Sequence, residues 1–336
     1  MDADIKLAIV IPAYKSEYLA DALLSISNQT DKRFRVYVGD DASPGPIREI
    51  CERFQDKLDL VYHRFSENLG GSSLIDQWHR CIELSSEPWV WIFSDDDKMD
   101  PGCVEAFYSS LEATEAGYDL CRFNTLDIDE NGKVIRISPP HPSLESGLEF
   151  AYHRLCRNRS SFVSEYIFSR IVFDEHDGMV KFPLAWCADD ASWIAFSGEK
   201  GIYTIYGPKV YWRNSRINIS FARTANKLQK VEACGQFLFW LKQKFTPGEI
   251  RKQLGIDAQY FRDCCADWLK FHLIIQAPLG PGIYLKIFRD EKFSDLGSPA
   301  KRLLTAIFLD IVYIFRLAPK CLSSLSKKFV RFRQDT

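Results

Sequence analysis

Three consecutive carboxylates, Asp95–Asp97, follow the apolar run Trp89–Phe93 after a single serine, Ser94. The run is typical of a buried strand, and aspartates disfavour strands and repel one another, so the triplet is expected just past the strand end. In open α/β sheets that end is where ligands bind. A hard divalent cation such as Mn²⁺ or Mg²⁺, bridging to substrate phosphates, is a natural partner. A helix start is the alternative, because Asp97, Asp100 and Pro101 also suit one.

The elements before the triplet alternate between two patterns. Apolar, β-branched runs predict strands at 7–12, 34–39, 58–63 and 89–93, and helical spacing predicts helices at 18–28, 47–54 and 74–84. This alternation predicts an α/β fold with an open, mostly parallel, doubly wound sheet flanked by helices. The first loop, Pro12–Ser16, lacks the GxGxxG pattern of dinucleotide-binding proteins. We therefore expect a nucleotide-type sheet without that loop.

The loops that follow the four strands should meet at one edge of the sheet. They are Pro12–Tyr14, Asp40–Asp41, Asn68–Gly71 and Asp95–Asp97. The ring of Tyr14 can stack on a base, and a carboxylate can accept hydrogen bonds from a base or ribose. With a cation on the triplet, the set fits a nucleotide-diphosphate site. Taken singly, Tyr14 also fits a packing role and Asp40–Asp41 an ordinary turn.

The later part of the chain mixes the two patterns. Helical spacing predicts helices at 104–114 and 144–157, and Asn131–Gly132 predicts a tight hairpin turn. Further strands are predicted at 119–123, 133–137, 163–172, 202–206 and 210–213. From about Thr224 the strand signals fade, and Lys227–Lys244 and Tyr260–Gln276 are predicted amphipathic helices. We therefore expect a catalytic domain at 1–222 and a helical region at 223–336.

Composition bounds the class of protein. The 336 residues are 46% hydrophobic with a formal net charge of −2, which argues against general nucleic-acid binding. Ten cysteines show no zinc-type spacing, and the start Met1–Lys6 has no signal-peptide character. These features predict a cytoplasmic protein with free, mostly buried thiols.

The C-terminal end supports two interpretations. The apolar run at 303–318 is interrupted by Asp310 and Arg316, so it is too short and too charged to predict a bilayer span. The tail from Lys320 is basic and could lie on the anionic inner face of a membrane. A helical cap with a solvated tail explains the same residues equally well.

The motifs around the predicted sheet edge also occur together in a known family. They are Val10–Tyr14, Ser25–Thr30, Gly39–Ser43, Glu67–Gly70 and Phe93–Asp97 with Pro101. Their order and spacing over residues 5–105 resemble family 2 glycosyltransferases of the GT-A fold. In that family the first aspartate pair and the Pro-x-Tyr stretch hold the nucleoside, and the aspartate-rich motif binds a divalent metal on the sugar-nucleotide diphosphate.

The resemblance assigns a donor-binding role to several residues. It implies that Asp41 binds the base, that Tyr14 lies against the base, and that Pro12, Asn68 and Gly70 complete the nucleotide-sugar site. Further along the chain, related enzymes often carry a loop over the diphosphate. Basic side chains in that loop could stabilise the leaving group. Here the residues at this place are Arg213, Arg216 and Ser220.

Two registers of the triplet remain open. Many family members carry Asp-x-Asp-Asp followed three residues later by Pro, and aligning on Pro101 puts Ser94 at the first aspartate and Asp96 at the metal ligand. Aligning on a plain Asp-x-Asp selects Asp95 and Asp97 instead. We prefer Asp96 as the ligand of Mn²⁺ or Mg²⁺ and keep all three as candidates, with Asp95 also beside the donor.

The family's catalytic base belongs to a Glu-Asp pair that opens a helix beneath the acceptor site. Asp189 and Asp190, with Trp193, lie at the corresponding distance, but Asp replaces the Glu. A carboxylate can deprotonate the attacking hydroxyl, and such a base contributes about 10²–10⁴-fold. We choose Asp190, with Asp189 orienting it or serving as the base instead. An acidic pair favoured by the helix dipole is the alternative.

The resemblance implies an inverting, metal-dependent glycosyltransferase. Its donor would be a nucleotide-diphosphate sugar, and its acceptor a glycan or lipid-linked chain in the synthesis of a cell-surface polysaccharide such as capsule or O-antigen. A nucleotidyltransferase is a second hypothesis, but those enzymes carry a Gly-rich, basic loop that Pro12–Ser16 does not resemble. A non-catalytic sugar-nucleotide binder is a third, and the intact acids argue against it.

Overall fold

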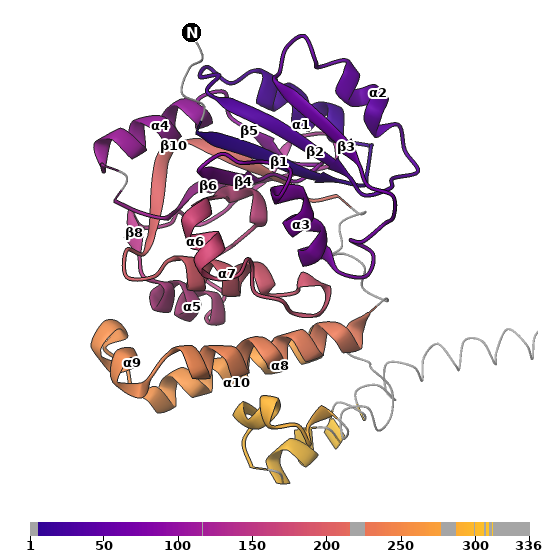
Figure 1. Ribbon diagram of the computed structural model, residues 1–336. Coiled ribbons are helices and arrows are strands. Elements are labelled where there is room, and N and C mark those ends of the chain that lie inside the picture. Colours follow the sequence, from indigo (N-terminus) through magenta and orange to yellow (C-terminus); the bar gives the residue numbers. More distant parts are fainter. Residues whose placement is uncertain are drawn as a thin grey trace, which may run out of the picture. The chain divides into compact units, whose positions relative to one another are not determined.

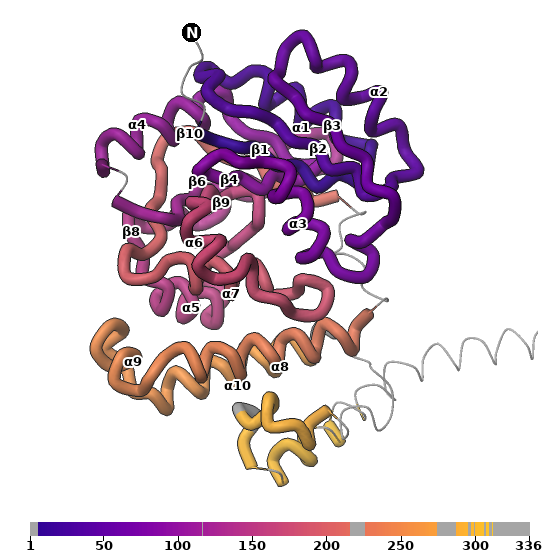
Figure 2. Tube along the Cα trace, viewed as in Figure 1, coloured from indigo at the N-terminus to yellow at the C-terminus, as the bar shows by residue number. Residues whose placement is uncertain are grey.

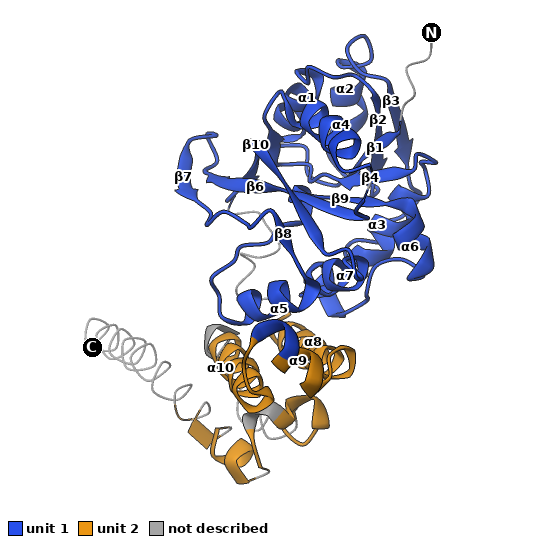
Figure 3. Ribbon diagram, turned by 90° about the vertical axis from the view of Figure 1, so that its left-hand side faces the viewer, with its two compact units in different colours: residues 1–222, 252–254 blue, residues 223–251, 255–336 orange. Residues whose placement is uncertain are grey.

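The computed structural model describes residues 6–115, 117–215, 226–276, 287–298, 300–305, 307–308 and 311. The chain divides into two compact units (Figure 3). Unit 1 comprises residues 1–222 and 252–254, and unit 2 comprises residues 223–251 and 255–336. The sheet and the sequence motifs described above lie in unit 1, whereas the described elements of unit 2 are helical.

A ten-stranded sheet forms the centre of unit 1 (Figure 1). Its order is β3-β2-β1-β4-β9-β6-β10-β5, with β7 beside β6 and β8 beside β10. The parallel half consists of β1 Leu7–Ala13, β2 Phe34–Asp40, β3 Leu60–Arg64 and β4 Trp89–Ile92. The other half is mixed and consists of β5 Lys98–Met99, β6 Leu120–Ile128, β7 Val134–Ile137, β8 Leu144–Glu145, β9 Tyr166–Ser169 and β10 Ile202–Arg213.

Helices cover both faces of this sheet. Those of unit 1 are α1 Leu19–Ser27, α2 Ile47–Glu52, α3 Leu74–Ile82, α4 Cys103–Ala113, α5 Gly147–Leu155, α6 Arg170–Glu175 and α7 Ala188–Phe196. Alternate residues of β1 and β2 pack with α1, α2 and α4 in one buried cluster, as the period of two in a strand requires. Figure 2 follows the same path, with α3 on the opposite side of β1 and β2 from α1. The predicted open α/β sheet flanked by helices is confirmed.

The register of the parallel strands brings their carboxyl ends level. Ala13 pairs with Asp40, Asp40 pairs with Arg64, and Val10 pairs with Ile92. The four loops after β1, β2, β3 and β4 therefore start from the same edge of the sheet. Their convergence follows from uninterrupted parallel pairing, which the apolar runs of the strands favour.

The strand that leads into the triplet is anchored by Trp91. Its side chain is fully buried, its ring stacks on Phe123 with centroids 5.4 Å apart, and its Nε1 donates to the carbonyl of Ser164 at 2.7 Å. Burying an aromatic ring of this size stabilises the fold by about 1.5–3 kcal/mol when its polar atom has a partner. The end of β4, from which the triplet follows, is therefore held in place by packing.

Three predicted strands differ in the structure. The predicted strand at 163–172 is β9 only in its middle, because the hydroxyl of Ser169 accepts from the N–H of Val172 and starts α6. The predicted strands at 202–206 and 210–213 are one strand, β10, whose register shifts between Ile205 and Lys209. Gly207, at φ +105°, allows this irregularity.

Unit 2 begins with α8 Lys227–Lys244, whose bounds match the predicted helix. α10 Ala258–Gln276 follows the short helix α9 Pro247–Leu254, and a 3-10 helix covers Glu291–Leu296. Within the unit the rings of Phe237 and Trp268 pack 5.7 Å apart. The predicted basic tail from Lys320 lies outside the described residues.

Among the helices of the described residues, none combines the length and the apolar character that a membrane crossing requires.

Candidate active site

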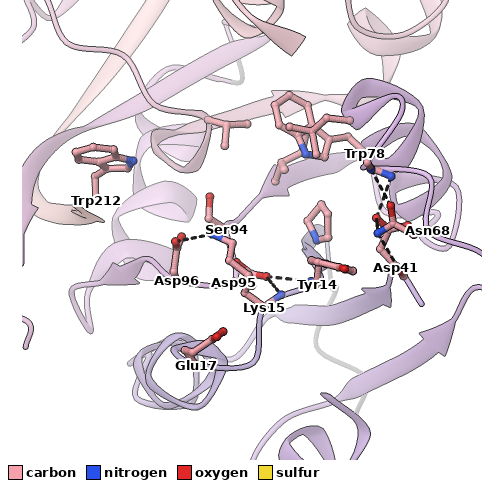
Figure 4. Close-up of a pocket in the computed structure, with 16 residues that line it drawn as sticks. Tyr14, Lys15, Glu17, Asp41, Asn68, Trp78, Ser94, Asp95, Asp96 and Trp212 are labelled. Atoms are coloured by element: carbon pink, nitrogen blue, oxygen red, sulfur yellow. Dashed lines mark hydrogen bonds and ion pairs between the residues drawn. The ribbon is translucent and has the colours of Figure 1, made fainter. Parts of the chain in front are cut away.

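A cavity of about 620 Å³ opens at the edge of the sheet where the four loops meet (Figure 4). This is an ordinary volume for a small-molecule site. Every loop contributes to its lining, which consists of Pro12, Tyr14, Lys15, Glu17, Asp41, Asn68, Gly70, Gly71, Leu74, Trp78, Ile92, Ser94, Asp95, Asp96, Val163 and Trp212. The structure thus brings seven predicted site residues to one cavity: Pro12, Tyr14, Asp41, Asn68, Gly70, Asp95 and Asp96.

Tyr14 presents its ring to this cavity. The side chain is 46% exposed, although its backbone is held on both sides. Its N–H donates to Asp95 at 3.0 Å, and its carbonyl accepts from the hydroxyl of Ser43 at 2.5 Å. A flat, accessible ring on a fixed backbone is suited to stacking on a base.

Asp41 is surrounded by donors from its own chain. Its carboxylate accepts from the N–H of Leu69 at 2.7 Å, the N–H of Gly70 at 2.9 Å, the amide of Asn68 at 3.0 Å and the guanidinium of Arg80 at 2.6 Å. A carboxylate has about four acceptor positions, so these bonds occupy its capacity. Asp41 therefore orders the loop at Asn68–Gly70, and its contact with a base stays a prediction.

The three aspartates of the triplet face different partners. Asp95 accepts from the N–H groups of Tyr14 and Lys15, at 3.0 and 2.9 Å. Asp97 accepts from the hydroxyl of Ser164 at 2.5 Å and from the N–H of Arg213 at 2.8 Å. The carboxylate of Asp96 accepts from the ammonium of Lys15, whose Nζ lies 3.1 Å from Oδ2. Only Asp95 and Asp96 of the three line the cavity.

Crowding of the carboxylates changes their acidity. Burial and then the charge of Asp96 raise the pKa of Asp95 to about 6 and that of Asp97 to about 7. Burial lowers the pKa of Lys15, but the attraction of Asp96 and Asp95 outweighs it, and the pKa is raised. A cation near Asp96 therefore relieves repulsion across the whole triplet.

The triplet offers a limited set of ligands for a metal ion. Within the described part of the chain, no group of three or more His, Cys, Asp or Glu side chains is arranged to hold one. Asp97 accepts hydrogen bonds at both oxygens, and Asp95 accepts two from the backbone. From the described residues Asp96 accepts a single one, from the ammonium of Lys15. Mg²⁺ is commonly held by one or two carboxylates, with substrate phosphates and water completing its shell. The residues thus fit a cation held by Asp96 together with a diphosphate.

Arg213 lies beneath the triplet and not in the lining of the cavity. Its side chain is fully buried, its Nε donates to the carbonyl of Asp96 at 2.7 Å, and its Nη2 lies 3.0 Å from Asp21. Arg213 therefore braces the loop of the triplet from within, which differs from the direct diphosphate contact we predicted. The predicted Arg216 and Ser220 lie outside the described residues.

The acid pair at the start of α7 occupies a strained turn. Leu184, Ala185 and Cys187 all have positive φ, between 54° and 62°. Such backbone costs about 1–3 kcal/mol per residue and is concentrated at functional sites. Asp189 and Asp190 follow as the first acidic residues of the helix, and neither lines the cavity described above.

Asp189 and Asp190 differ in their surroundings. The buried carboxylate of Asp190 forms a paired contact with Arg154, at 2.9 Å from Nε and 2.8 Å from Nη2. Asp189 is partly exposed, and desolvation and then the charge of Asp190 raise its pKa to about 7. A carboxyl group with a pKa near neutrality is suited to exchanging protons, whereas an ion-paired carboxylate is suited to positioning.

Sequence reasoning overlooked three residues of the site. Lys15 follows Tyr14 directly, so a basic residue in that loop was a usable signal. Trp78 lies one helical turn into α3 and lines the cavity with Tyr14. Ser164 bonds to Asp97 across 67 positions of sequence, and no local pattern indicates that pairing.

Comparison with known proteins agrees with this geometry. The family model Glycosyl transferase family 2 matches residues 8–166. Glycosyltransferase GlyG of Streptococcus pneumoniae serotype 4 is 27% identical over 128 residues, which are 37% of this chain. The chain spans 40% of the length of that relative.

Two solved structures share the fold. S. aureus TarS 1-349 in complex with UDP-GlcNAc has a TM-score of 0.55 and 14% identity, covering 93% of this chain and 92% of that one. The mannosyltransferase PcManGT from Pyrobaculum calidifontis, in complex with GDP-Man and Mn²⁺, has a TM-score of 0.51 and 14% identity, covering 91% and 87%. Residues 8–166, which carry the triplet and all four loops, match the model of glycosyl transferase family 2, and the chain shares the GT-A fold of the solved structures.

Proposed function

We propose that the protein transfers a sugar from a nucleotide-diphosphate sugar to a hydroxyl of a glycan or lipid-linked acceptor, with inversion at the anomeric carbon. The observation that carries this proposal is the cavity bounded by the exposed ring of Tyr14 and the carboxylate of Asp96. The structural neighbours in complex with UDP-GlcNAc and with GDP-Man support a donor of this class. Surface polysaccharide synthesis in the cytoplasm is part of the proposal, and the free thiols of the described cysteines accord with a reducing compartment.

In the proposed complex, the base of the donor stacks on Tyr14 and the diphosphate extends toward Asp96. The backbone of the loop at Asn68–Gly70, ordered by Asp41, borders the nucleoside. When bound, Mn²⁺ or Mg²⁺ supplies positive charge that neutralises the leaving diphosphate, and Asp96 is the residue that would hold it. The neighbour in complex with Mn²⁺ supports this choice of cofactor.

We assign the base to Asp189, with Asp190 as its positioning partner. The hydroxyl oxygen of the acceptor forms a bond to the anomeric carbon while the bond to the diphosphate breaks, and the proton passes to the carboxylate of Asp189. Two observations support this order over the reverse: the paired contact of Asp190 with Arg154 and the raised pKa of Asp189. Our sequence-based choice of Asp190 is retained as the alternative.

Turnover of nucleotide sugars tests the proposal. The purified protein is incubated with UDP-, GDP-, CDP- and dTDP-sugars and Mn²⁺, and release of nucleoside diphosphate is measured. We expect release with one nucleotide class, lost on Asp96→Ala and retained on Asp59→Ala, a surface aspartate paired with Arg35. Release of pyrophosphate from a nucleoside triphosphate and a sugar phosphate would indicate a nucleotidyltransferase. Binding without turnover of any donor would indicate a non-catalytic binding protein.

A further inference from the structure

Lys15 is a basic residue in the lining of the cavity. Its Nζ lies 3.1 Å from Oδ2 of Asp96, and its N–H donates to Asp95 at 2.9 Å. The side chain is 26% exposed, so the ammonium reaches the cavity while its backbone is held by the triplet. Figure 4 shows Lys15 between Asp95 and Asp96 on the wall of the cavity.

The charges around the cavity are unbalanced. The lining contains four carboxylates, on Glu17, Asp41, Asp95 and Asp96, and among these lining residues Lys15 alone carries positive charge. A diphosphate is itself an anion, and placing it beside several carboxylates without a cation is strongly unfavourable. Binding of a nucleoside diphosphate therefore requires positive charge near Asp96, and Lys15 already stands there.

The geometry of Lys15 leaves donors for such a ligand. An ammonium group has three N–H donors, and Asp96 accepts from one of them. The remaining donors can reach phosphate oxygens that enter the cavity, and lysine is a common point-charge binder of phosphates. The other oxygen of Asp96 accepts no hydrogen bond from the described residues, so a cation and Lys15 can both use this carboxylate.

We propose that Lys15 is a built-in cation of the donor site, whose ammonium bridges Asp96 and the diphosphate and allows a nucleoside diphosphate to bind without a divalent metal. This role rests on the proposed function, because it presupposes a nucleotide-diphosphate donor in the cavity. It concerns binding and leaves the requirement for a metal in turnover as a separate property.

Calorimetric titration tests the proposal with UDP, GDP, CDP and dTDP, and with the parent nucleosides. The wild type is expected to bind one nucleoside diphosphate in EDTA. In EDTA, Lys15→Met and Lys15→Gln should bind it about 10-fold or more weakly, since a charge-assisted hydrogen bond is lost. Affinity for the nucleoside should stay unchanged, and Lys15→Arg should retain most of the affinity for the diphosphate.

Lys200→Met is the matched control. The ammonium of Lys200 lies 2.8 Å from the carboxylate of Asp119, and neither residue lines the cavity. A variant is included in the comparison only if its melting temperature equals that of the wild type. Lys15→Gln replaces Lys15→Met if Lys15→Met does not fold. Equal affinity of wild type and Lys15→Gln in EDTA would overturn the role of Lys15, as would wild-type binding that appears only with Mn²⁺. Absence of binding to every nucleoside diphosphate, with and without Mn²⁺, would overturn the proposed function itself.

Discussion

Asp96 and Asp97 are adjacent in sequence but serve different surroundings. Asp96 faces the cavity and the ammonium of Lys15, whereas Asp97 is 1% exposed and bonded to Ser164 and the backbone of Arg213. Substitution by alanine should therefore have different consequences at the two positions. One should act on the reaction and the other on the fold.

We expect Asp96→Ala to reduce sugar transfer by about 100-fold or more, because the charge that positions the diphosphate is removed. Its melting temperature should stay near that of the wild type. Asp97→Ala should lower the free energy of unfolding by about 1–3 kcal/mol, since the buried donors of Ser164 and Arg213 lose their acceptor. Chemical denaturation and turnover of the two variants, measured side by side, check this contrast, which equal effects on stability would contradict.

Asp189 should determine how turnover depends on pH. A base must be ionised to accept a proton, and its pKa is raised to about 7. We expect kcat/KM to fall about tenfold per unit below pH 7 and to level off above it. Asp189→Asn should lower turnover by about 10²–10⁴-fold and remove this pH dependence. The control is Asp174→Asn, which should keep the pH dependence, because Asp174 lies outside the cavity and outside the Asp189–Asp190 pair. A profile with no inflection near pH 7 would return the role to Asp190.

At the scale of elements, the loop between β3 and α3 depends on a glycine. A Cβ added at Gly70 would lie 2.7 Å from Oδ2 of Asp41, closer than side chains approach one another. We expect Gly70→Ala to displace the loop from Asp41, to lower the melting temperature and to weaken nucleotide binding. Gly102→Ala is the control, because a Cβ there meets no atom within 4 Å. Calorimetry with the nucleotide measures both variants, and unchanged affinity for Gly70→Ala would show that the loop does not contribute.

The contact of α5 with α7 depends on the pair Arg154–Asp190. Arg154 belongs to the last turn of α5, and Asp190 to the first turn of α7. We expect Arg154→Met to lower the free energy of unfolding by about 3 kcal/mol, because a buried carboxylate loses its partner. The double variant Arg154→Met with Asp190→Asn should recover part of that loss. Urea denaturation tests both, and no recovery in the double variant would indicate that Arg154 acts through packing.

At the scale of the whole molecule, the chain joins an α/β unit to a helical one. The basic tail that follows the described helices carries the hypothesis of membrane contact. We expect the full chain to co-sediment with vesicles that contain anionic lipid, and a version that ends at Gly297 to stay in solution. Neither protein should co-sediment with neutral vesicles. Equal sedimentation of the two versions would remove the hypothesis and leave the tail as a solvated end.

Much of unit 1 could be predicted because its signals are local. β-Branched runs such as Leu7–Pro12 and the spacing of apolar residues in α1 and α3 depend on near neighbours in sequence, so strands and helices were identified within a few residues. The strand predicted at 163–172 failed where local signals conflict. Ile171 and Val172 favour a strand, but the cap at Ser169 starts a helix there.

The meeting of the aromatic and acidic residues of four loops at one sheet edge follows from the amino-acid sequence alone, because parallel strands place their carboxyl ends together. Which carboxylate faces which partner depends instead on how the folded chain packs. Asp97 is bound by Ser164 and Arg213, which are 67 and 116 positions away, and Asp96 is left to Lys15 and the cavity. Partners so distant come together only through packing of the sheet, and three identical side chains in a row carry no local signal that distinguishes them.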